Sequence, residues 1–555
     1  MTRIVECVPN FSEGRDKTVI DRIVDAISKA RSAEGEGVKV LNVDPGEATN
    51  RTVVTFTGSP EAVCEAAFQG AKKAQELIDM RLHHGAHPRS GATDVLPLVP
   101  VAGITLEECA ELARGIAKRM WEELGIPCYC YEAAAFKPEH RNLAACRAGE
   151  YEALPEKIAG SNVPDFGPAD GKMNETILKA GASNVGARNF LVAVNFNLNT
   201  TSTRRASAVA FDVREKGRQV NGEWIPGTLK GCKAIGWYID EYDIAQVSMN
   251  ITDIAATPLH KAFDEVCDKA RARGMRVTGA EIVGLVPKSV LIDAGRHYLE
   301  MQGRSTGIAE AEIIKIAVKS MGLDDLKPFD PKEKVIEYLM QDEAELARKE
   351  RLIRMSVKDL AAETASESPA PGGGSISAIM GAFAAALGTM VANLSAHKRG
   401  WDDRWKEFSD IADEGQRVMD RLLKLVDEDT RSFDAIMAAF GLPKGTPEEQ
   451  AARAEAIEAA TLKAAQVPME TIKASLAAFP VLKAVAEKGN PASASDAGVG
   501  ALAARAAVRG AMLNVKINAA GLNDKAKAAQ LIAEAEGYAA RAQAAEEEIL
   551  AIIKL

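Results

Sequence analysis

The sequence lacks the cysteine patterns of disulfide-rich proteins. Its eight cysteines all lie in the first half of the 555-residue chain, the last being Cys267, and no two of them form a CxxC pair. Cysteines 128 and 130 are separated by one residue, which is the alternation of a strand. This distribution favours scattered buried thiols in a reduced, cytoplasmic protein.

Positive charge and a targeting signal are also scarce. The formal net charge of −10 argues against nucleic acid as a partner. The first residues, MTRIVECVPNF, lack the basic-then-apolar layout of a signal peptide.

One uncharged stretch, SAIMGAFAAALGTMVANLSA at residues 377–396, has nearly the length of a membrane span. It consists mostly of Ala, Gly, Ser and Thr, with few large apolar side chains. We therefore expect no membrane span but the central helix of a helical domain, covered on all sides. Gly381, Ala385 and Gly388 would let neighbouring helices approach it closely.

The chain's length and patterns predict an α/β plus all-α protein of three or four structural units. Strand and helix patterns alternate up to about Pro331, with a Gly/Pro/Asp-rich break at residues 161–172. This predicts two α/β subdomains, 1–180 and 181–335, each a sheet covered by helices. A charged helical linker, 336–355, follows. From 356 to 555 alanine dominates and strand signals vanish, which predicts a bundle of long helices.

The stretch HHGAHPRSGATD, residues 83–94, has three of the seven histidines. His83 and His87 are four apart, which on a helix would suit a metal. The intervening glycine and Pro88 predict a loop instead, because proline disfavours the helical region for the residue before it. The loop is a solvated turn, a metal site, or an acid/base site in which Asp44 or Asp94 holds an imidazole. Histidine suits the last role because its pKa lies near neutrality.

Three further stretches lie in the helical half. SPAPGGGSISA places Gly372, Gly373, Gly374 and Ser375 at the start of the apolar helix, either as a flexible cap or as backbone donors for a polar ligand. LVDEDTRSFDAI has three adjacent acidic residues, 427–429. Such clusters are typical of a solvated face, but the large apolar neighbours favour one inward carboxylate of raised pKa.

The third stretch, LNVKIN, has Asn514 and Asn518 on one helical face. They are either core amides or ligand contacts.

Several long motifs resemble a known family. ECVPNFSEG (6–14), NRTVVTF (50–56), GAHPRSGATDV (85–95), GAR (186–188), IGWYIDEYDIAQVSMN (235–250) and VGLVP (283–287) are similar to the formimidoyltransferase part of the formimidoyltransferase-cyclodeaminase family. SPAPGGGS, LVDEDTRSF and NVKIN resemble its cyclodeaminase part. The resemblance covers nearly the whole chain, in the family's domain order.

The resemblance implies a bifunctional enzyme of histidine degradation. It would transfer the formimidoyl group from N-formimidoyl-L-glutamate to N5 of tetrahydrofolate. It would then cyclise 5-formimidoyltetrahydrofolate to 5,10-methenyltetrahydrofolate with release of ammonia. The resemblance implies tetrahydrofolate, in polyglutamylated form, as co-substrate, with no metal. It also implies a cytoplasmic homo-oligomer with dimer contacts in both halves.

The resemblance also assigns site residues. His87 in GAHPR is the transferase acid/base, and Asp429 is the cyclodeaminase carboxylate. The family has Glu before this histidine, where this chain has Ala86. Asp44 is a candidate to orient the imidazole. The expected substrate-binding and folate-binding residues are Arg51, Arg89, Gly186, Arg188, Gly372, Gly373, Gly374, Ser375, Asn514 and Asn518.

Two alternatives stay open at this point. One is a glutamate formyltransferase fused to a methenyltetrahydrofolate cyclohydrolase-like domain, because a formimidoyl NH and a formyl O differ by one donor. The other is a non-catalytic folate-binding assembly protein. Turnover of the two donors and binding of tetrahydrofolate discriminate among the three.

Overall fold

The computed structural model describes residues 3–47, 49–85, 88–341 and 343–553. It divides into two compact units, Met1–Leu291 with Met321–Met340, and Ile292–Ser320 with Gln341–Leu555. The second unit therefore takes Ile292–Ser320 out of the stretch expected to form the second α/β subdomain. The reason is a set of hydrogen bonds to the bundle. Thr306 bonds Ser409 and Asp413, and Asn393 donates to the carbonyl of Gly307.

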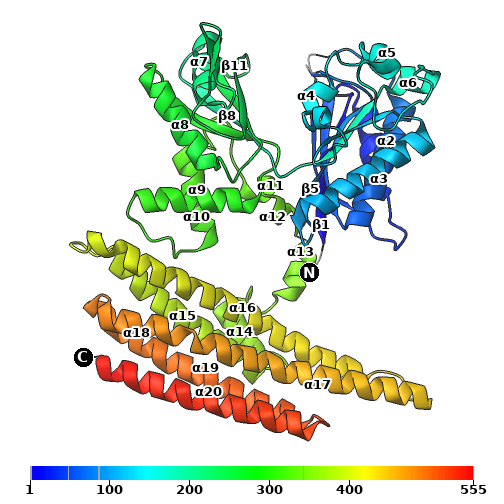
Figure 1. Ribbon diagram of the computed structural model, residues 1–555. Coiled ribbons are helices and arrows are strands. Elements are labelled where there is room, and N and C mark those ends of the chain that lie inside the picture. Colours follow the sequence, from blue (N-terminus) through cyan, green and yellow to red (C-terminus); the bar gives the residue numbers. More distant parts are fainter. Residues whose placement is uncertain (1–2, 48, 86–87, 342, 554–555) are drawn as a thin grey trace. The chain divides into compact units, whose positions relative to one another are not determined.

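A seven-stranded sheet forms the first part of the α/β unit (Figure 1). Its order is β1-β4-β2-β5-β7-β6 with β3 paired to β4. Only the β5–β7 and β6–β7 pairs are parallel among the described strands. The strands are β1 (Ile4–Cys7), β2 (Asn10–Phe11), β3 (Lys39–Gly46), β4 (Arg51–Gly58), β5 (Thr93–Ala102), β6 (Cys128–Glu132) and β7 (Ser183–Ala187).

Helices α1 (Lys17–Lys29), α2 (Pro60–Leu77) and α3 (Leu106–Leu124) share one core with this sheet. Each begins where its sequence signals a start: Asp16, Ser59 and Thr105 cap the three N-termini. Shorter elements connect β6 to β7. They are η1 (Pro138–Arg141), α4 (Leu143–Cys146), α5 (Leu154–Glu156), η2 (Lys157–Ser161) and α6 (Glu175–Ala180).

A four-stranded antiparallel sheet, in the order β11-β12-β8-β13, forms the second part of this unit. Helices α7 and α8 cover one of its faces, where Val194, Phe196 and Val266 are buried. Its elements are β8 (Val192–Leu198), α7 (Thr203–Val213), a hairpin of β9 (Arg218–Val220) and β10 (Glu223–Ile225), β11 (Cys232–Ile239), β12 (Ile244–Ile251), α8 (Leu259–Ala272) and β13 (Val277–Val283). The sequence predicted two α/β subdomains, each a sheet covered by helices, and the two sheets confirm this fold class.

The region expected to be a helical linker consists of short helices. They are α12 (Ile336–Met340) and α13 (Glu343–Lys349). Before the linker come α9 (Lys288–Met301), α10 (Glu310–Met321) and α11 (Pro331–Lys334). All eight cysteines are free, and six of them are buried, as their scattered positions predicted.

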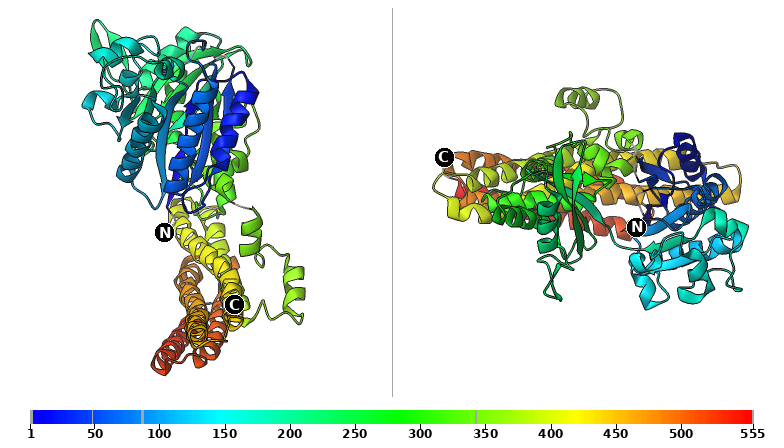
Figure 2. Two further views of the ribbon diagram at one scale, coloured as in Figure 1. Left: turned by 90° about the vertical axis from the view of Figure 1, so that its right-hand side faces the viewer. Right: turned by 90° about the horizontal axis from the view of Figure 1, so that it is seen from above.

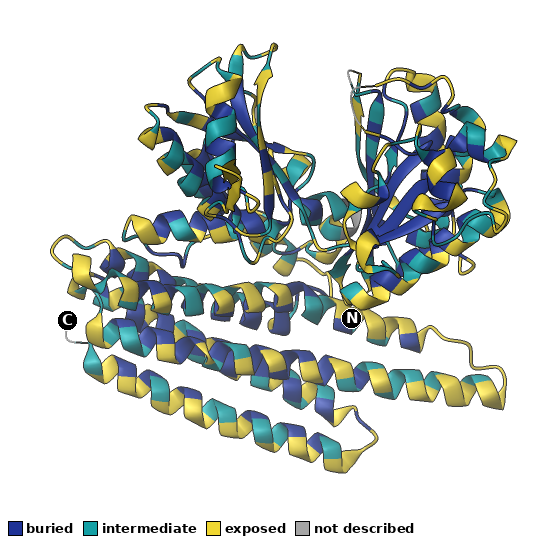
Figure 3. Ribbon diagram, turned by 45° about the horizontal axis from the view of Figure 1, so that its top comes forward, coloured by how far each residue is buried: buried dark blue, intermediate teal, exposed yellow. Residues whose placement is uncertain are grey.

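Long helices make up the second unit, as the alanine-rich composition predicted. Figure 2 shows them running side by side, and in Figure 3 their buried sides face inward. The long helices are α15 (Gly373–Ala396), α16 (Trp405–Phe440), α17 (Pro447–Leu476), α18 (Ala478–Lys488), α19 (Ala494–Ala520) and α20 (Lys525–Ile552). The short elements of this unit are α14 (Val357–Thr364), η3 (Asp402–Arg404) and η4 (Pro491–Ser493).

Helix α15 contains the uncharged stretch 377–396 that has nearly the length of a membrane span. It alone among the described helices has the length and hydropathy of a span, and 61% of its apolar window is buried inside the protein. Gly381 and Gly388 lie against side chains of neighbouring helices, so small residues do permit close packing. The expectation that it is covered on all sides is wrong for a single chain, because Phe383 is 58% exposed.

Candidate active sites

A cavity of about 520 Å³ lies between the two sheets of the α/β unit. We call it the sheet cleft. Strand alternation explains its polar lining, because the faces turned away from the helices carry every second residue of each strand. Its polar lining residues are Glu6, Asn10, Asn42, Asp44, Thr49, Arg51, Thr55, Arg188, Asn195, Trp237, Ser248 and Asn250.

Asp94 lies outside the lining of the sheet cleft and holds Arg51, which lines it. Its fully buried carboxylate accepts hydrogen bonds from Arg51 at 2.7 Å, from Arg147 at 2.9 Å and from the Ser90 backbone N–H at 2.9 Å. Arg51 also donates to Asn10 at 2.9 Å, and burial lowers the pKa of Arg51 to about 10. The structure thus gives Asp94 the role of holding two arginines. Its expected role beside an imidazole stays a prediction, because His87 lies outside the described residues.

Removal of this carboxylate should destabilise the α/β unit. We expect Asp94→Ala to lower the free energy of unfolding by about 3–5 kcal/mol, because two buried guanidinium groups lose their counter-charge. Chemical denaturation measures this. Asp21→Ala is the control, because its ion pair with Lys17 is exposed and should contribute little. Equal stability of the two variants would contradict the structural role of Asp94.

Other residues expected in the transferase site have different positions. Arg89 donates to Glu150 at 3.0 Å and to Glu152 at 2.6 Å, and it is not among the residues that line the sheet cleft. At Gly186 a Cβ would come within 2.6 Å of Tyr131, so this glycine allows β7 to approach β6. These contacts give both residues a structural role, and their expected role in substrate binding stays a prediction.

The histidine loop is only partly described. His87 and Ala86 lie outside the described residues. His83 is buried, and its Nε2 lies 2.8 Å from the carbonyl oxygen of Asn50. Burial lowers the pKa of His83, which favours the neutral imidazole. The described part of residues 78–92 is not helical, as the sequence predicted.

Glu6 is the acidic residue of the sheet cleft that sequence reasoning did not single out. It is only 4% exposed, and burial raises its pKa to about 7, while Arg188 lowers it and Glu337 raises it. The signal that could have found it is ECVPN, in which Glu6 and Asn10 are four positions apart and so point to the same face of an extended chain. Asn195 and Ser248 were missed for the same reason, in NFN and SMN.

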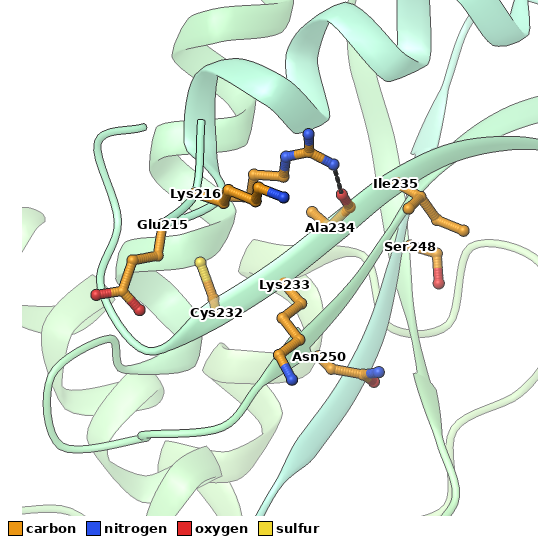
Figure 4. Close-up of a pocket in the computed structure, with 9 residues that line it drawn as sticks. Glu215, Lys216, Cys232, Lys233, Ala234, Ile235, Ser248 and Asn250 are labelled. Atoms are coloured by element: carbon orange, nitrogen blue, oxygen red, sulfur yellow. Dashed lines mark hydrogen bonds between the residues drawn. The ribbon is translucent and has the colours of Figure 1, made fainter. Parts of the chain in front are cut away.

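A second cavity of about 520 Å³ adjoins the sheet cleft and shares Ser248 and Asn250 with it. We call it the cationic cavity. Figure 4 shows Lys216, Lys233 and Glu215 around it, with Lys233 and Asn250 on the neighbouring strands β11 and β12, where they are register partners. Arg214 is the third cation, and it donates to the carbonyl of Ala234 at 3.3 Å. Three basic side chains against one carboxylate favour an anionic ligand.

In the helical unit, Asp429 of α16 faces the N-terminus of α15. Ser375 Oγ lies 3.1 Å from Asp429 Oδ2 and donates at 2.8 Å to the carbonyl of Val426. A Cβ at Gly374 would collide with the Asp429 carboxylate, so glycine is required for this approach. Burial raises the pKa of Asp429, and hydrogen bonds from Ser375 partly oppose the shift.

The other candidate residues of the helical unit are Asp427, Asn514 and Asn518, and only Asn514 lies beside the N-terminus of α15. Asp427 is buried and accepts from the backbone N–H of Leu352 at 2.9 Å, so it is the inward carboxylate that holds the chain before α14. Asn514 lies beside Gly373, where a Cβ would be 3.2 Å from its Nδ2. Asn518 is partly buried and donates to the carbonyl of Ala464 at 2.7 Å, which favours the structural alternative, and its expected role in ligand binding stays a prediction.

Within the ranges that the structure describes, no group of three or more His, Cys, Asp or Glu side chains is arranged to hold a metal ion. Fold and sites together define a class of protein: an enzyme with two separate centres, one in an α/β unit and one in a helical unit. Each centre contains a carboxyl group whose pKa is raised by burial.

Comparison with known proteins specifies the family. Residues 4–188 match the formiminotransferase domain, N-terminal subdomain, residues 193–341 match the formiminotransferase domain, and residues 356–537 match formiminotransferase-cyclodeaminase. The chain belongs to the formimidoyltransferase-cyclodeaminase family. It is 43% identical to the formimidoyltransferase-cyclodeaminase of Gallus gallus over 93% of this chain and 92% of the relative.

Two further relatives match only one half. The glutamate formimidoyltransferase of Streptococcus pyogenes is 42% identical over 54% of this chain and 95% of its own length. A solved structure of formiminotetrahydrofolate cyclodeaminase from Thermotoga maritima is 28% identical, covers 36% of this chain and 97% of that chain, and has a TM-score of 0.33.

Proposed function

We propose that the protein is a bifunctional folate enzyme. It transfers the formimidoyl group from N-formimidoyl-L-glutamate to N5 of tetrahydrofolate, and it cyclises the product to 5,10-methenyltetrahydrofolate with release of ammonia. The observation that carries this proposal is the continuous similarity to the Gallus gallus enzyme, which spans the sheet cleft and the Asp429 site in one chain. The test supplies both substrates and measures both products, as described in the Discussion.

Transfer requires a group that takes up and returns one proton. N5 attacks the amidine carbon, and a tetrahedral intermediate forms. His87 removes the N5 proton and then protonates the departing glutamate nitrogen. Asp44 lines the sheet cleft and remains the candidate to orient this imidazole, since Asp94 holds two arginines. Arg188 lines the same cavity and binds a substrate carboxylate. Arg51 lines it too, but its guanidinium is held by Asp94 and Asn10.

Cyclisation is an intramolecular reaction in which N10 attacks the same carbon. Binding both ends of one molecule supplies much of the rate. Asp429 accepts the N10 proton and protonates the departing nitrogen as ammonia. Its raised pKa suits both steps, because the carboxyl group exchanges a proton more readily near neutral pH. Gly373 and Asn514 form the adjoining wall, where the folate ring binds.

The cationic cavity suits the carboxylates of a polyglutamylated folate tail. It shares the lining residues Ser248 and Asn250 with the sheet cleft, so it lies within reach of the tail of a folate bound in the cleft. Both reactions move only protons and a one-carbon unit, so we propose that neither uses a metal, and we propose a cytoplasmic location.

The fused formyltransferase and cyclohydrolase remains the second candidate. A methenyltetrahydrofolate cyclohydrolase of Methylorubrum extorquens is 40% identical, but over only 34% of this chain. The similarity to bifunctional relatives over both halves favours the first candidate.

We also propose that two copies of the helical unit form a dimer that completes the Asp429 site. A stripe of exposed apolar side chains follows α15 and α19, which run antiparallel with Gly373 beside Asn514 and Gly500 beside Ala384. One end of the stripe adjoins Asn514. The stripe consists of Phe383, Met390, Leu394, Val499, Leu502, Leu513 and Ile517. A group of exposed apolar side chains on two neighbouring helices is typical of an interface. A second dimer contact in the α/β unit would then build a closed assembly.

Charges placed in this stripe should separate the dimer. We expect Leu513→Glu with Ile517→Glu to weaken dimerisation by at least about 100-fold, because two carboxylates would be buried against apolar side chains. Light scattering on residues 356–555 measures the mass, and cyclisation should fall with it. Val357→Glu is the control, because Val357 is 77% exposed on α14 outside the stripe. An active monomer of the unchanged segment at micromolar concentration would exclude the shared site.

A further inference from the structure

Glu6 is a buried carboxyl group that lines the sheet cleft and accepts no hydrogen bond from the residues that the structure describes. It lies on β1, between Thr57 of β4 and Val99 of β5 in the ladder, so its backbone position is fixed on both sides. Its side chain is 4% exposed and lines the cavity. Among the described contacts, no hydrogen bond or ion pair to its carboxylate is formed. Such a group is costly to bury unless a ligand supplies the missing donors.

The charges around Glu6 show what kind of ligand fits. Arg188 attracts its carboxylate, Glu337 repels it, and burial raises its pKa to about 7. Of the other charged groups in the cavity, Arg51 is already held by Asp94 and Asn10, and Asp44 is acidic. A buried carboxylate beside a guanidinium matches a ligand that carries a planar cation and a carboxylate close together.

N-Formimidoyl-L-glutamate is such a ligand. Its amidine is basic and is protonated at neutral pH, so the one-carbon end carries two N–H groups and a positive charge. Its α-carboxylate lies two bonds from the amidine nitrogen. The formyl analogue has the same shape, but its neutral carbonyl oxygen replaces one N–H donor and the positive charge is absent. The two donors therefore differ most at the group that faces a carboxylate.

We propose that Glu6 binds the amidinium of the formimidoyl donor through paired N–H···O hydrogen bonds, with Arg188 on the donor's carboxylate, and that Glu6 thereby selects formimidoyl over formyl donors. This inference rests on the proposed function and adds its specificity-determining residue. The ionised carboxylate keeps the amidine protonated, and a protonated amidine carbon is the better electrophile for N5. A formyl oxygen in this position would be repelled by the carboxylate oxygens of Glu6, because both groups are hydrogen-bond acceptors. The carboxylate would then have no donor.

Glu6→Gln tests the proposal by calorimetric binding of N-formimidoylglutamate and N-formylglutamate. We expect affinity for the formimidoyl ligand to fall by about 100-fold or more, because a site built for a charged donor loses its counter-charge. Affinity for the formyl ligand should stay the same or increase. Glu6→Asp should keep the preference at reduced affinity, which separates selectivity from folding. Glu107→Gln, in the exposed first turn of α3, is the control and should change neither affinity.

The pH profile provides an independent readout. Because the pKa of Glu6 is raised to about 7, affinity of the unchanged protein for the formimidoyl ligand should decrease as the pH falls below that value. Glu6→Gln should lose this dependence. Equal losses for both ligands, or an unchanged preference, would overturn the inference. Failure of the proposed function is distinguishable, because it would show as absent formimidoyl turnover by the unchanged protein.

Discussion

Asp429→Asn should stop cyclisation while formimidoyl transfer continues. The amide keeps the shape of the side chain and its contact with Ser375, but it cannot accept the N10 proton. We expect the rate of cyclisation to fall by about 10²–10⁴-fold, the usual contribution of a positioned acid/base. With both substrates supplied, 5-formimidoyltetrahydrofolate should accumulate, and chromatography of the folates measures it.

Two neighbours of Asp429 provide matched controls. Glu428→Gln changes the adjacent acidic residue, which pairs with Arg421 at 3.4 Å, and should leave both activities nearly unchanged. Asp427→Asn should lower stability instead, because Asp427 holds the backbone N–H groups of Leu352 and Ile353. Full cyclisation by a folded Asp429→Asn protein would remove Asp429 from the mechanism.

His87→Ala should have the opposite effect. Formimidoyl transfer should fall by about 10²–10⁴-fold, because no other group is assigned to carry the proton from N5 to the glutamate nitrogen. Cyclisation of supplied 5-formimidoyltetrahydrofolate should continue at the normal rate, since Asp429 belongs to the other unit. Initial rates with each substrate alone measure the two activities separately.

His84→Ala is the control for this loop. His84 is exposed, and its described contact is made by its backbone carbonyl, which accepts from Asn50 at 3.0 Å. We expect both activities of this variant to remain. Loss of transfer in His84→Ala, with transfer retained in His87→Ala, would show that the assignment of proton transfer to His87 is wrong.

Local sequence signals predicted most of the fold. The caps at Asp16, Ser59 and Thr105 are short-range features, and the structure begins a helix after each of them. The boundary between units was not predictable in this way. Residues 292–320 have the same helical pattern as their neighbours, and only contacts such as Thr306 with Ser409, 103 residues away, place them in the helical unit.

The candidate sites were predicted less completely, and for the same reason. Motifs pointed to Asp429 and Ser375, which the structure brings within 3.1 Å across 54 residues. Arg89 carried the same signal as Arg188, but Glu150 and Glu152 neutralise it from more than 60 residues away. The role of Asp94 depends on Arg147, which no local pattern connects to it. The exposed side chains of α15 were not predicted either, because the sequence does not show which faces of a helix its neighbours cover.

Quantifying 5,10-methenyltetrahydrofolate and ammonia, the two products that the second step forms, tests the central claim most directly. Protein is supplied with N-formimidoylglutamate and tetrahydrofolate, the near-ultraviolet absorbance of 5,10-methenyltetrahydrofolate is followed, and ammonia is measured in the same sample. The account predicts equal amounts of the two products, formed only when both substrates are present. It would be contradicted if methenyltetrahydrofolate formed without ammonia, as from a formyl donor, or if neither product formed.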